Sequence, residues 1–141
     1  MRALLLATLP LLVGCEQTRD LSTSGCLPLH APARVVLAQE ALLVRIRDAP
    51  SLVLMGLPRD TTHDGFHRIA PVRTLPAGTA LTIERLSQHH GFDSGAGRIS
   101  AFGVTPDGER FEYGWGSGTR IGRAPWEPAS VPTLREVRCE S

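Results

Sequence analysis

The sequence predicts an all-β protein: a single small antiparallel sandwich or partly open barrel of about seven strands. Three observations support this prediction. Short apolar runs alternate with polar residues at a period of two. Turn-forming residues separate these runs at close intervals, and a cysteine near the end of the chain can pair with one near its start. The part between these cysteines has about 115 residues, enough for one domain and too few for two.

The first strands are expected at residues 34–37 and 42–47, followed by a short apolar run at 52–55. In the second of these segments three apolar side chains share one face and two arginines share the other, which is the pattern of a half-buried strand. A helix is the alternative for residues 35–46, because VVLAQEALLVRI contains good helix formers. We favour strands here.

The middle of the chain predicts an edge strand, a turn and a longer strand. Residues 69–75 are interrupted by Pro71, which fits an edge because proline has no N–H to donate to a neighbouring strand. Pro-Ala-Gly at 76–78 is a turn sequence. The alternation of the strand at 80–86 slips near its end, which predicts a bulge at residues 84–85.

The clearest strand signal lies in the last third of the chain. Residues 99–104 and 110–115 both alternate, and Pro-Asp-Gly at 106–108 joins them in a tight turn. This pattern predicts a β-hairpin. A Gly- and Pro-rich segment at 116–132 then leads to a last strand at 133–139.

One turn resembles a known fold. The sequence LPAGT at residues 75–79, placed before a Thr- and Ile-containing strand, is loosely similar to bacterial SH3-like domains. The similarity covers about a dozen residues. It implies that the partly open barrel is SH3-like.

The first fifteen residues are typical of an export signal. A positive start is followed at residues 3–13 by an apolar run that is too short to cross a bilayer, which takes about 20 apolar residues. The end of this run resembles the lipobox of bacterial lipoproteins: Leu12-Val13-Gly14-Cys15. The resemblance implies that the Cys15 thiol receives diacylglycerol, that residues 1–14 are removed, and that the new amino group receives an acyl chain such as palmitate. An ordinary signal peptide or a buried N-terminal helix is the alternative.

The resemblance also bears on location and domain organisation. In lipoproteins of enteric-type bacteria an Asp after the lipidated Cys favours retention at the inner membrane, and Glu16 stands there instead. This implies a lipid anchor in the outer membrane, with the protein facing the periplasm. Residues 15–25 continue as a polar stretch that predicts a flexible tether, roughly 33 Å long when extended. The folded β-domain is then expected at residues 26–141.

The remaining cysteines predict a disulfide. With Cys15 assigned to lipid, only Cys26 and Cys139 are left. Cysteines usually pair in the oxidising compartment beyond the inner membrane. In the chain-entropy description, closing a loop of about 100 residues contributes roughly 4.7 kcal/mol. Two separate buried thiols are the alternative.

The charge of the chain disfavours some partners. All 15 basic residues are arginine, and removal of the signal leaves 14 of them against 14 acidic residues. No run of like charges is visible. A nucleic-acid binder is expected to carry a basic patch, and a polybasic membrane contact is expected to carry a basic cluster, so we expect neither.

Loop histidines and late aromatic residues are the candidate partner contacts. Two polar segments, at 59–68 and 88–97, are expected to be loops. Their histidines could bind zinc or copper, but exposed loop histidines are favoured because no defined ligand pattern accompanies them. Phe111 and Tyr113 are expected in the core. The candidate contact residues are His63, Asp64, Phe66, His67, His89, His90, Phe92, Trp115 and Trp126.

No pattern for catalysis is present in the sequence. It contains no GxSxG and no P-loop or HExxH, so we expect no enzyme, metal or cofactor. We expect a lipid-anchored binding or accessory module of the Gram-negative envelope that meets an envelope protein or peptidoglycan. An inhibitor or immunity lipoprotein against a periplasmic toxin or a cell-wall lytic enzyme is the alternative, by analogy of architecture. An enzyme is a third class, because active sites are assembled in space.

Overall fold

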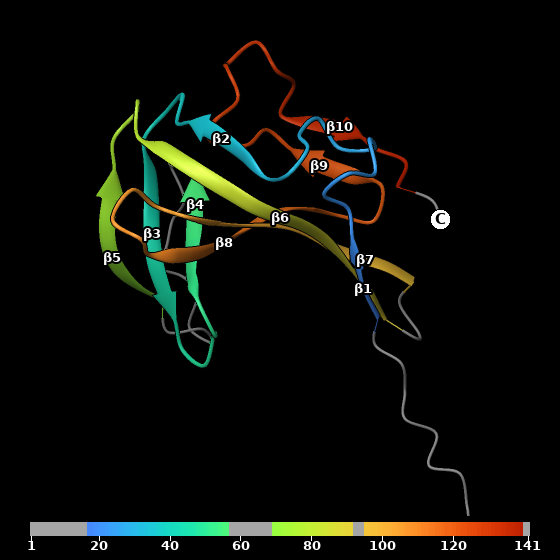
Figure 1. The fold of residues 1–141 in the computed structure, drawn as a ribbon, viewed down its shortest axis with the longest axis horizontal. Coiled ribbons are helices and arrows are strands. Elements are labelled where there is room, and N and C mark those ends of the chain that lie inside the picture. Colours follow the sequence, from blue (N-terminus) through green and yellow to red (C-terminus); the bar gives the residue numbers. More distant parts are fainter. Residues whose placement is uncertain (1–16, 57–68, 92–94, 140–141) are drawn as a thin grey trace, which may run out of the picture.

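The computed structural model describes residues 17–56, 69–91 and 95–139 (Figure 1). Within these ranges ten strands form one mixed, mostly antiparallel open sheet, and no helix occurs. The all-β prediction is therefore confirmed, and the helical alternative for residues 35–46 is wrong. The number of strands was underestimated, because the shortest strands show too few alternating positions to be detected.

Ten strands follow one another along the chain. They are β1 (Gln17–Asp20), β2 (Ala33–Val36), β3 (Ala41–Ile46), β4 (Leu52–Gly56), β5 (Ile69–Leu75), β6 (Ala80–Gly91), β7 (Gly95–Val104), β8 (Arg110–Ser117), β9 (Arg120–Gly122) and β10 (Leu134–Glu136), all within the described ranges.

The sheet runs in the order β1-β6-β7-β8-β4-β3-β5, with β2 also pairing with β6, β9 with β8, and β10 with β9. The pairing of β4 with β8 is parallel and the others are antiparallel, so the expectation of a purely antiparallel fold is corrected. β5 lies at one edge of the main path, as Pro71 indicated. The predicted bulge in β6 is confirmed by a register shift between Ile83 and Arg85. No helix that could cross a membrane is found in the described part of the chain.

The described residues of the segment at 88–97 do not form a loop. Residues 88–91 continue β6 and residues 95–97 begin β7, so that the two strands form a long hairpin. Gln88 stabilises it from inside the core, where its side chain is 1% exposed and its Nε2 donates to the carbonyls of Gly97 and Gly118, at 3.3 and 3.1 Å. Pairing of residues 87–90 with both β1 and β7 holds this stretch as a strand although its polar and glycine residues have poor strand propensity.

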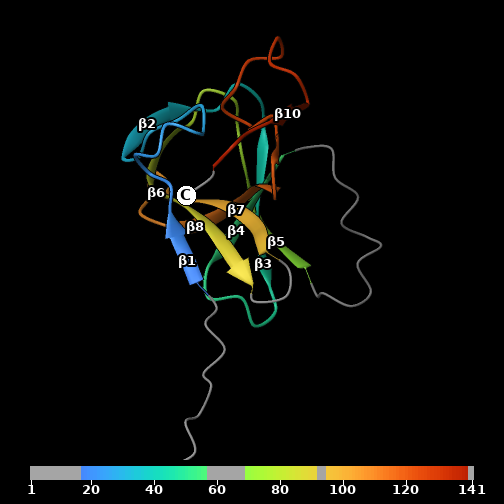
Figure 2. The same ribbon diagram turned by 90° about the vertical axis from the view of Figure 1, so that its right-hand side faces the viewer.

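The start of the described chain differs from the expected tether. Residues 17–20 form β1, which pairs with residues 87–90 of β6 (Figure 2). Leu21 follows directly and is 1% exposed, and its N–H donates to the Leu86 carbonyl at 2.8 Å. The prediction of a flexible tether is therefore wrong from residue 17 onward. The buried Leu21 side chain and the four paired residues of β1 hold this polar stretch against the domain.

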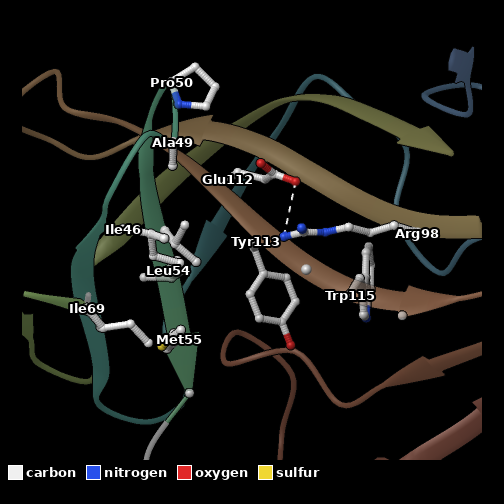
Figure 3. Close-up of a pocket in the computed structure, with 14 residues that line it drawn as sticks. Ile46, Ala49, Pro50, Leu54, Met55, Ile69, Arg98, Glu112, Tyr113 and Trp115 are labelled. Atoms are coloured by element: carbon white, nitrogen blue, oxygen red, sulfur yellow. Dashed lines mark ion pairs between the residues drawn. The ribbon is translucent and has the colours of Figure 1, made fainter. Parts of the chain in front are cut away.

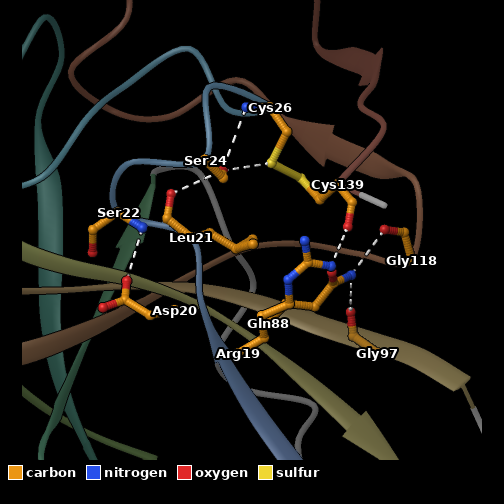
Figure 4. The surroundings of a disulfide bond; sticks show 10 residues. All are labelled: Arg19, Asp20, Leu21, Ser22, Ser24, Cys26, Gln88, Gly97, Gly118 and Cys139. Carbon is orange, nitrogen blue, oxygen red and sulfur yellow. Dashed lines mark hydrogen bonds between the residues drawn. A yellow bond between two sulfur atoms is a disulfide. The ribbon is translucent and has the colours of Figure 1, made fainter. Parts of the chain in front are cut away.

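The Cys26–Cys139 disulfide is present, as predicted (Figure 4). The two Cα atoms are 5.1 Å apart although the cysteines are separated by 113 positions in the sequence. Arg19 of β1 donates from its Nη1 to the Cys139 carbonyl at 2.7 Å. The two ends of the domain are therefore joined covalently and also through β1.

The main core lies on one face of the sheet and contains the aromatic residues of β8. Phe111, Tyr113 and Trp115 are 1%, 9% and 2% exposed, so Phe111 and Tyr113 are in the core, as predicted. Trp126, from the Gly- and Pro-rich segment, makes edge-on contacts with Tyr113 and Trp115 at ring-centroid distances of 5.1 and 5.4 Å. This edge-on geometry is favourable for aromatic pairs. Through these contacts Trp126 packs the Gly- and Pro-rich segment against β8.

Candidate functional site

The face of the sheet opposite the main core, which we call the outer face, carries the candidate site. Alternation along the strands decides which side chains lie there. In β7, Ile99 and Ala101 enter the core, so Ser100 and Phe102 lie on the outer face. In β4, Leu52 and Leu54 belong to the core, whereas Val53 and Met55 form a second, smaller apolar cluster with Val44 of β3. The outer face is therefore apolar over β3, β4 and β5 and polar over β6 and β7.

A hollow of about 680 Å³, which we call the apolar hollow after one of its walls, lies between the β3–β4–β5 side of the outer face and residues 112–116 of β8 (Figure 3). Its apolar walls come from the β3–β4 connection and from the three strands themselves. These side chains belong to Ile46, Ala49, Pro50, Val53, Met55 and Ile69. The hollow offers a place for an apolar group of a partner.

A polar hollow of about 430 Å³ adjoins it over β1, β6, β7 and β8. It is lined by three hydroxyl groups, two guanidinium groups, one imidazole, one aromatic ring and one carboxylate. They belong to Thr18, Ser87, Ser100, Arg85, Arg98, His89, Phe102 and Glu112. The Arg85 guanidinium lies 4.3 Å from the centre of the Phe102 ring, which is a cation–π contact.

Arg98 and Glu112 line both hollows and join them. Arg98 Nη2 lies 3.3 Å from Glu112 Oε1, and Ser100 donates to the same oxygen at 2.8 Å. The Arg98 side chain passes close to Gly114 of β8, where a Cβ would lie 3.4 Å from Arg98 Nη2. Figure 3 shows Arg98 reaching across β8 toward the carboxylate. The Arg98 side chain is still 56% exposed, so it can also contact a ligand.

The charges of the polar hollow favour an anionic ligand. Its two guanidinium groups stand against one carboxylate, and the Glu112 carboxylate is already bound by Arg98 and Ser100. Arg85 lies against an aromatic face, and a guanidinium forms strong bidentate bonds with a carboxylate. Among the described residues no three His, Cys, Asp or Glu side chains gather to hold a metal ion.

The predicted contact residues differ in whether they line a hollow and in how exposed they are. His89 lines the polar hollow, while His90 lines neither hollow. Trp115 lines the apolar hollow but is 2% exposed, and its Nε1 donates to the Gly122 carbonyl at 3.0 Å. Trp126 is half-buried in the aromatic cluster. The other predicted residues lie outside the described ranges: His63, Asp64, Phe66, His67 and Phe92.

The arginines, serines and carboxylate of the outer face were not predicted from the sequence. The signal was present, because residues 85, 87 and 89 alternate with Leu86 and Gln88, and residues 98, 100 and 102 alternate with Ile99 and Ala101. This alternation was missed because residues 88–97 were expected to form a loop, although residues 88–91 belong to β6 and residues 95–97 to β7. No known protein family, curated protein or solved structure matches the chain.

Tyr113 connects the site with the core. It lines the apolar hollow, and its hydroxyl lies 3.5 Å from the Arg123 carbonyl, to which it donates. Burial, and to a lesser extent the nearby Glu127 carboxylate, raises the pKa of this phenol from 10.0 to about 12, although Arg135 acts in the opposite direction. The folded protein therefore holds the phenol in its neutral form over a wider pH range than the unfolded chain does.

This shift predicts a loss of stability in alkali. Between pH 10 and about 12 the unfolded phenol has lost its proton while the folded phenol keeps it, so stability falls as the pH rises through this window. The chain has one tyrosine, so tyrosinate absorbance reports on this residue alone. We expect a midpoint near 12 for the folded protein and near 10 in urea. Equal midpoints in both conditions would show that Tyr113 is not buried in this way.

Proposed function

We propose that the chain is a lipid-anchored binding or accessory module of the Gram-negative envelope and not an enzyme. The observation that carries the binding role is the outer face, where an apolar hollow and a cationic polar hollow meet at Arg98 and Glu112. The location is supported by the lipobox-like sequence ending at Cys15 and by the closed Cys26–Cys139 pair. A disulfide is typical of the oxidising compartment beyond the inner membrane.

The partner should carry an anionic group beside an apolar one. The polar hollow offers Arg85 and Arg98 to a carboxylate, and the apolar hollow beside it can bury a side chain of the same partner. An envelope protein and the peptide part of peptidoglycan both offer such pairs of groups. Glu112 disfavours a ligand with several negative charges, because like charges held close together repel.

We also propose the finer form of the fold, a partly open barrel of SH3-like type. β5 lies at one edge of the main strand order, and the short turn at residues 76–79 connects it with β6 near the other edge. Arg73 of β5 forms ion pairs with Glu109 and, at 2.8 Å, with Asp107, both near the turn between β7 and β8. These contacts support a sheet that curls toward itself.

A periplasmic inhibitor is the second candidate function. The β6–β7 hairpin, accompanied by β1, extends from the rest of the sheet (Figure 1). An inhibitor needs a protruding element of this kind to enter an active site. The two functions differ in where the partner binds, at the end of the β6–β7 hairpin near Gly91 and Gly95 or in the hollows of the outer face.

A pull-down from solubilised envelope tests the proposed function. We expect the tagged, lipidated protein to retain an envelope component through its outer face. Arg98→Glu places a second carboxylate beside Glu112. Because Arg98 is proposed to bind the anionic group of the partner, and like charges facing each other across an interface repel, capture should fall at least about tenfold.

Two control variants make the pull-down interpretable. Arg138→Gln removes an exposed arginine that lines neither hollow, and it should capture as the unchanged protein does. Cys15→Ser removes the proposed anchor and should release the protein from the membrane fraction. Equal capture by Arg98→Glu and the unchanged protein would contradict a binding role of the outer face.

A further inference from the structure

The distance between the proposed anchor and the sheet is very short. One residue, Glu16, separates Cys15 from Gln17, the first residue of β1. A chain extends by at most about 3.6 Å per residue, so the Cα atoms of Cys15 and Gln17 are within about 7 Å of each other. In the proposed anchor, the acyl groups hold Cys15 at the bilayer surface. The flexible tether expected from the sequence is therefore absent from residue 17 onward.

The pairing register of β1 shows which part of the domain lies next to Cys15. Gln17 pairs with His90 of β6, and His90 pairs in turn with Ala96 of β7. Neighbouring strands lie about 4.8 Å apart, so Ala96 is roughly 10 Å from Gln17 across two strand spacings. Gly91 and Gly95 lie one position further along the same hairpin. We call this end of the sheet the hairpin end; it contains His90, Gly91, Gly95, Ala96 and Gln17.

β1 cannot easily separate from the domain to lengthen the link. All four of its residues pair with β6, and Leu21, which follows it, is buried in the main core. Arg19 is bonded to the carbonyl of Cys139, next to the disulfide (Figure 4). Releasing β1 would break these contacts and expose Leu21 to water.

We propose that the hairpin end is a membrane-contact surface, and that the domain is held directly on the lipid headgroups with this end toward the bilayer. The inference rests on the proposed lipid anchor at Cys15. Apart from Gln17 and His90, the described part of this end carries only glycine and alanine, so no carboxylate among its described residues opposes contact with anionic headgroups. The turn at residues 76–78, at the other end of β6, then points away from the membrane.

Two exposed alanines form a matched pair for the test. Ala96 lies at the hairpin end, and Ala77 lies in the turn before β6. The twelve residues of β6 separate the two ends by roughly 35 Å. Because Cys15 is acylated and the other two cysteines are paired, Ala96→Cys or Ala77→Cys supplies the single free thiol for a fluorophore. Lipidated protein is reconstituted into phosphatidylethanolamine–phosphatidylglycerol vesicles that contain a headgroup-nitroxide lipid.

We expect severalfold stronger quenching of the label at residue 96 than of the label at residue 77. Insertion of ten Gly/Ser residues between Glu16 and Gln17 should remove most of this difference. Equal quenching at the two positions, in protein that floats with the vesicles, would overturn the membrane-contact surface while leaving the anchor intact. Protein that is not acylated and does not float would instead refute the proposed anchor, and the inference with it.

Discussion

Replacing both Cys26 and Cys139 by serine is expected to lower the free energy of unfolding by about 2–5 kcal/mol. The disulfide closes a loop of 113 positions, so its removal restores a large amount of freedom to the unfolded chain. Both cysteines also pack against the main core, where serine hydroxyls are less favourable. Urea unfolding followed by the fluorescence of Trp115 and Trp126 measures the change.

Reduction of the unchanged protein is the matched control for this prediction. The reduced protein and the double serine variant should unfold at similar urea concentrations, both well below the oxidised protein. β1 should loosen as well, because Arg19 bonds to the Cys139 carbonyl. An oxidised protein no more stable than the serine variant would mean that the ends of the domain are held together by other contacts.

Gly116→Ala is expected to destabilise the protein by about 3 kcal/mol, at the upper end of the cost of overpacking. Gly116 pairs with both Ile99 of β7 and Ile121 of β9. A Cβ at this position would collide with the carbonyl oxygen of Arg120 and lie 2.7 Å from the Cα of Ile121. These are backbone atoms, so they cannot move aside without separating β9 from β8. Thermal or urea unfolding measures the loss.

Gly114→Ala is the control on the same strand. There a Cβ would meet only the Arg98 side chain, with its nearest atom at 3.4 Å. A flexible side chain can shift by a small fraction of its length, so the expected loss is below about 1 kcal/mol. Similar effects of the two substitutions would contradict the close approach of β9 to Gly116.

Regular alternation made most of the strands predictable. The hairpin of β7 and β8 was located within a few residues because Phe111 and Tyr113 face the core and Pro-Asp-Gly marks the turn. The Cys26–Cys139 pair followed from counting cysteines once Cys15 was assigned to lipid. The edge position of β5 followed from Pro71, whose missing N–H excludes a central place in the sheet.

The elements that were missed depend on pairing across the chain rather than on local sequence. Residues 17–20 are polar and become a strand through pairing with residues 87–90, which also pair with β7 on their other side. The parallel pairing of β4 with β8 joins segments that lie far apart in the sequence and leaves no local signal. Short or polar strands of this kind are decided by tertiary context.

The candidate site was the least predictable part. Arg98 and Glu112 come from different strands and meet only because β7 and β8 are adjacent. Loop residues, mainly histidine and phenylalanine, and two tryptophans were predicted instead, because tryptophan commonly contacts partners. His89 lines the polar hollow and is exposed, whereas Trp115 lines the apolar hollow but is 2% exposed. Recognising the polar alternation in the hairpin would have found the arginines.

The intact mass of the protein, isolated from the envelope of its own host, tests the central claim most directly. A membrane-anchored, disulfide-closed domain should begin at Cys15, carry the mass of the diacylglycerol and the additional acyl chain, and weigh two hydrogens less than the form with free Cys26 and Cys139 thiols. A chain that begins at Met1, lacks acyl groups, or has both thiols free would contradict the account.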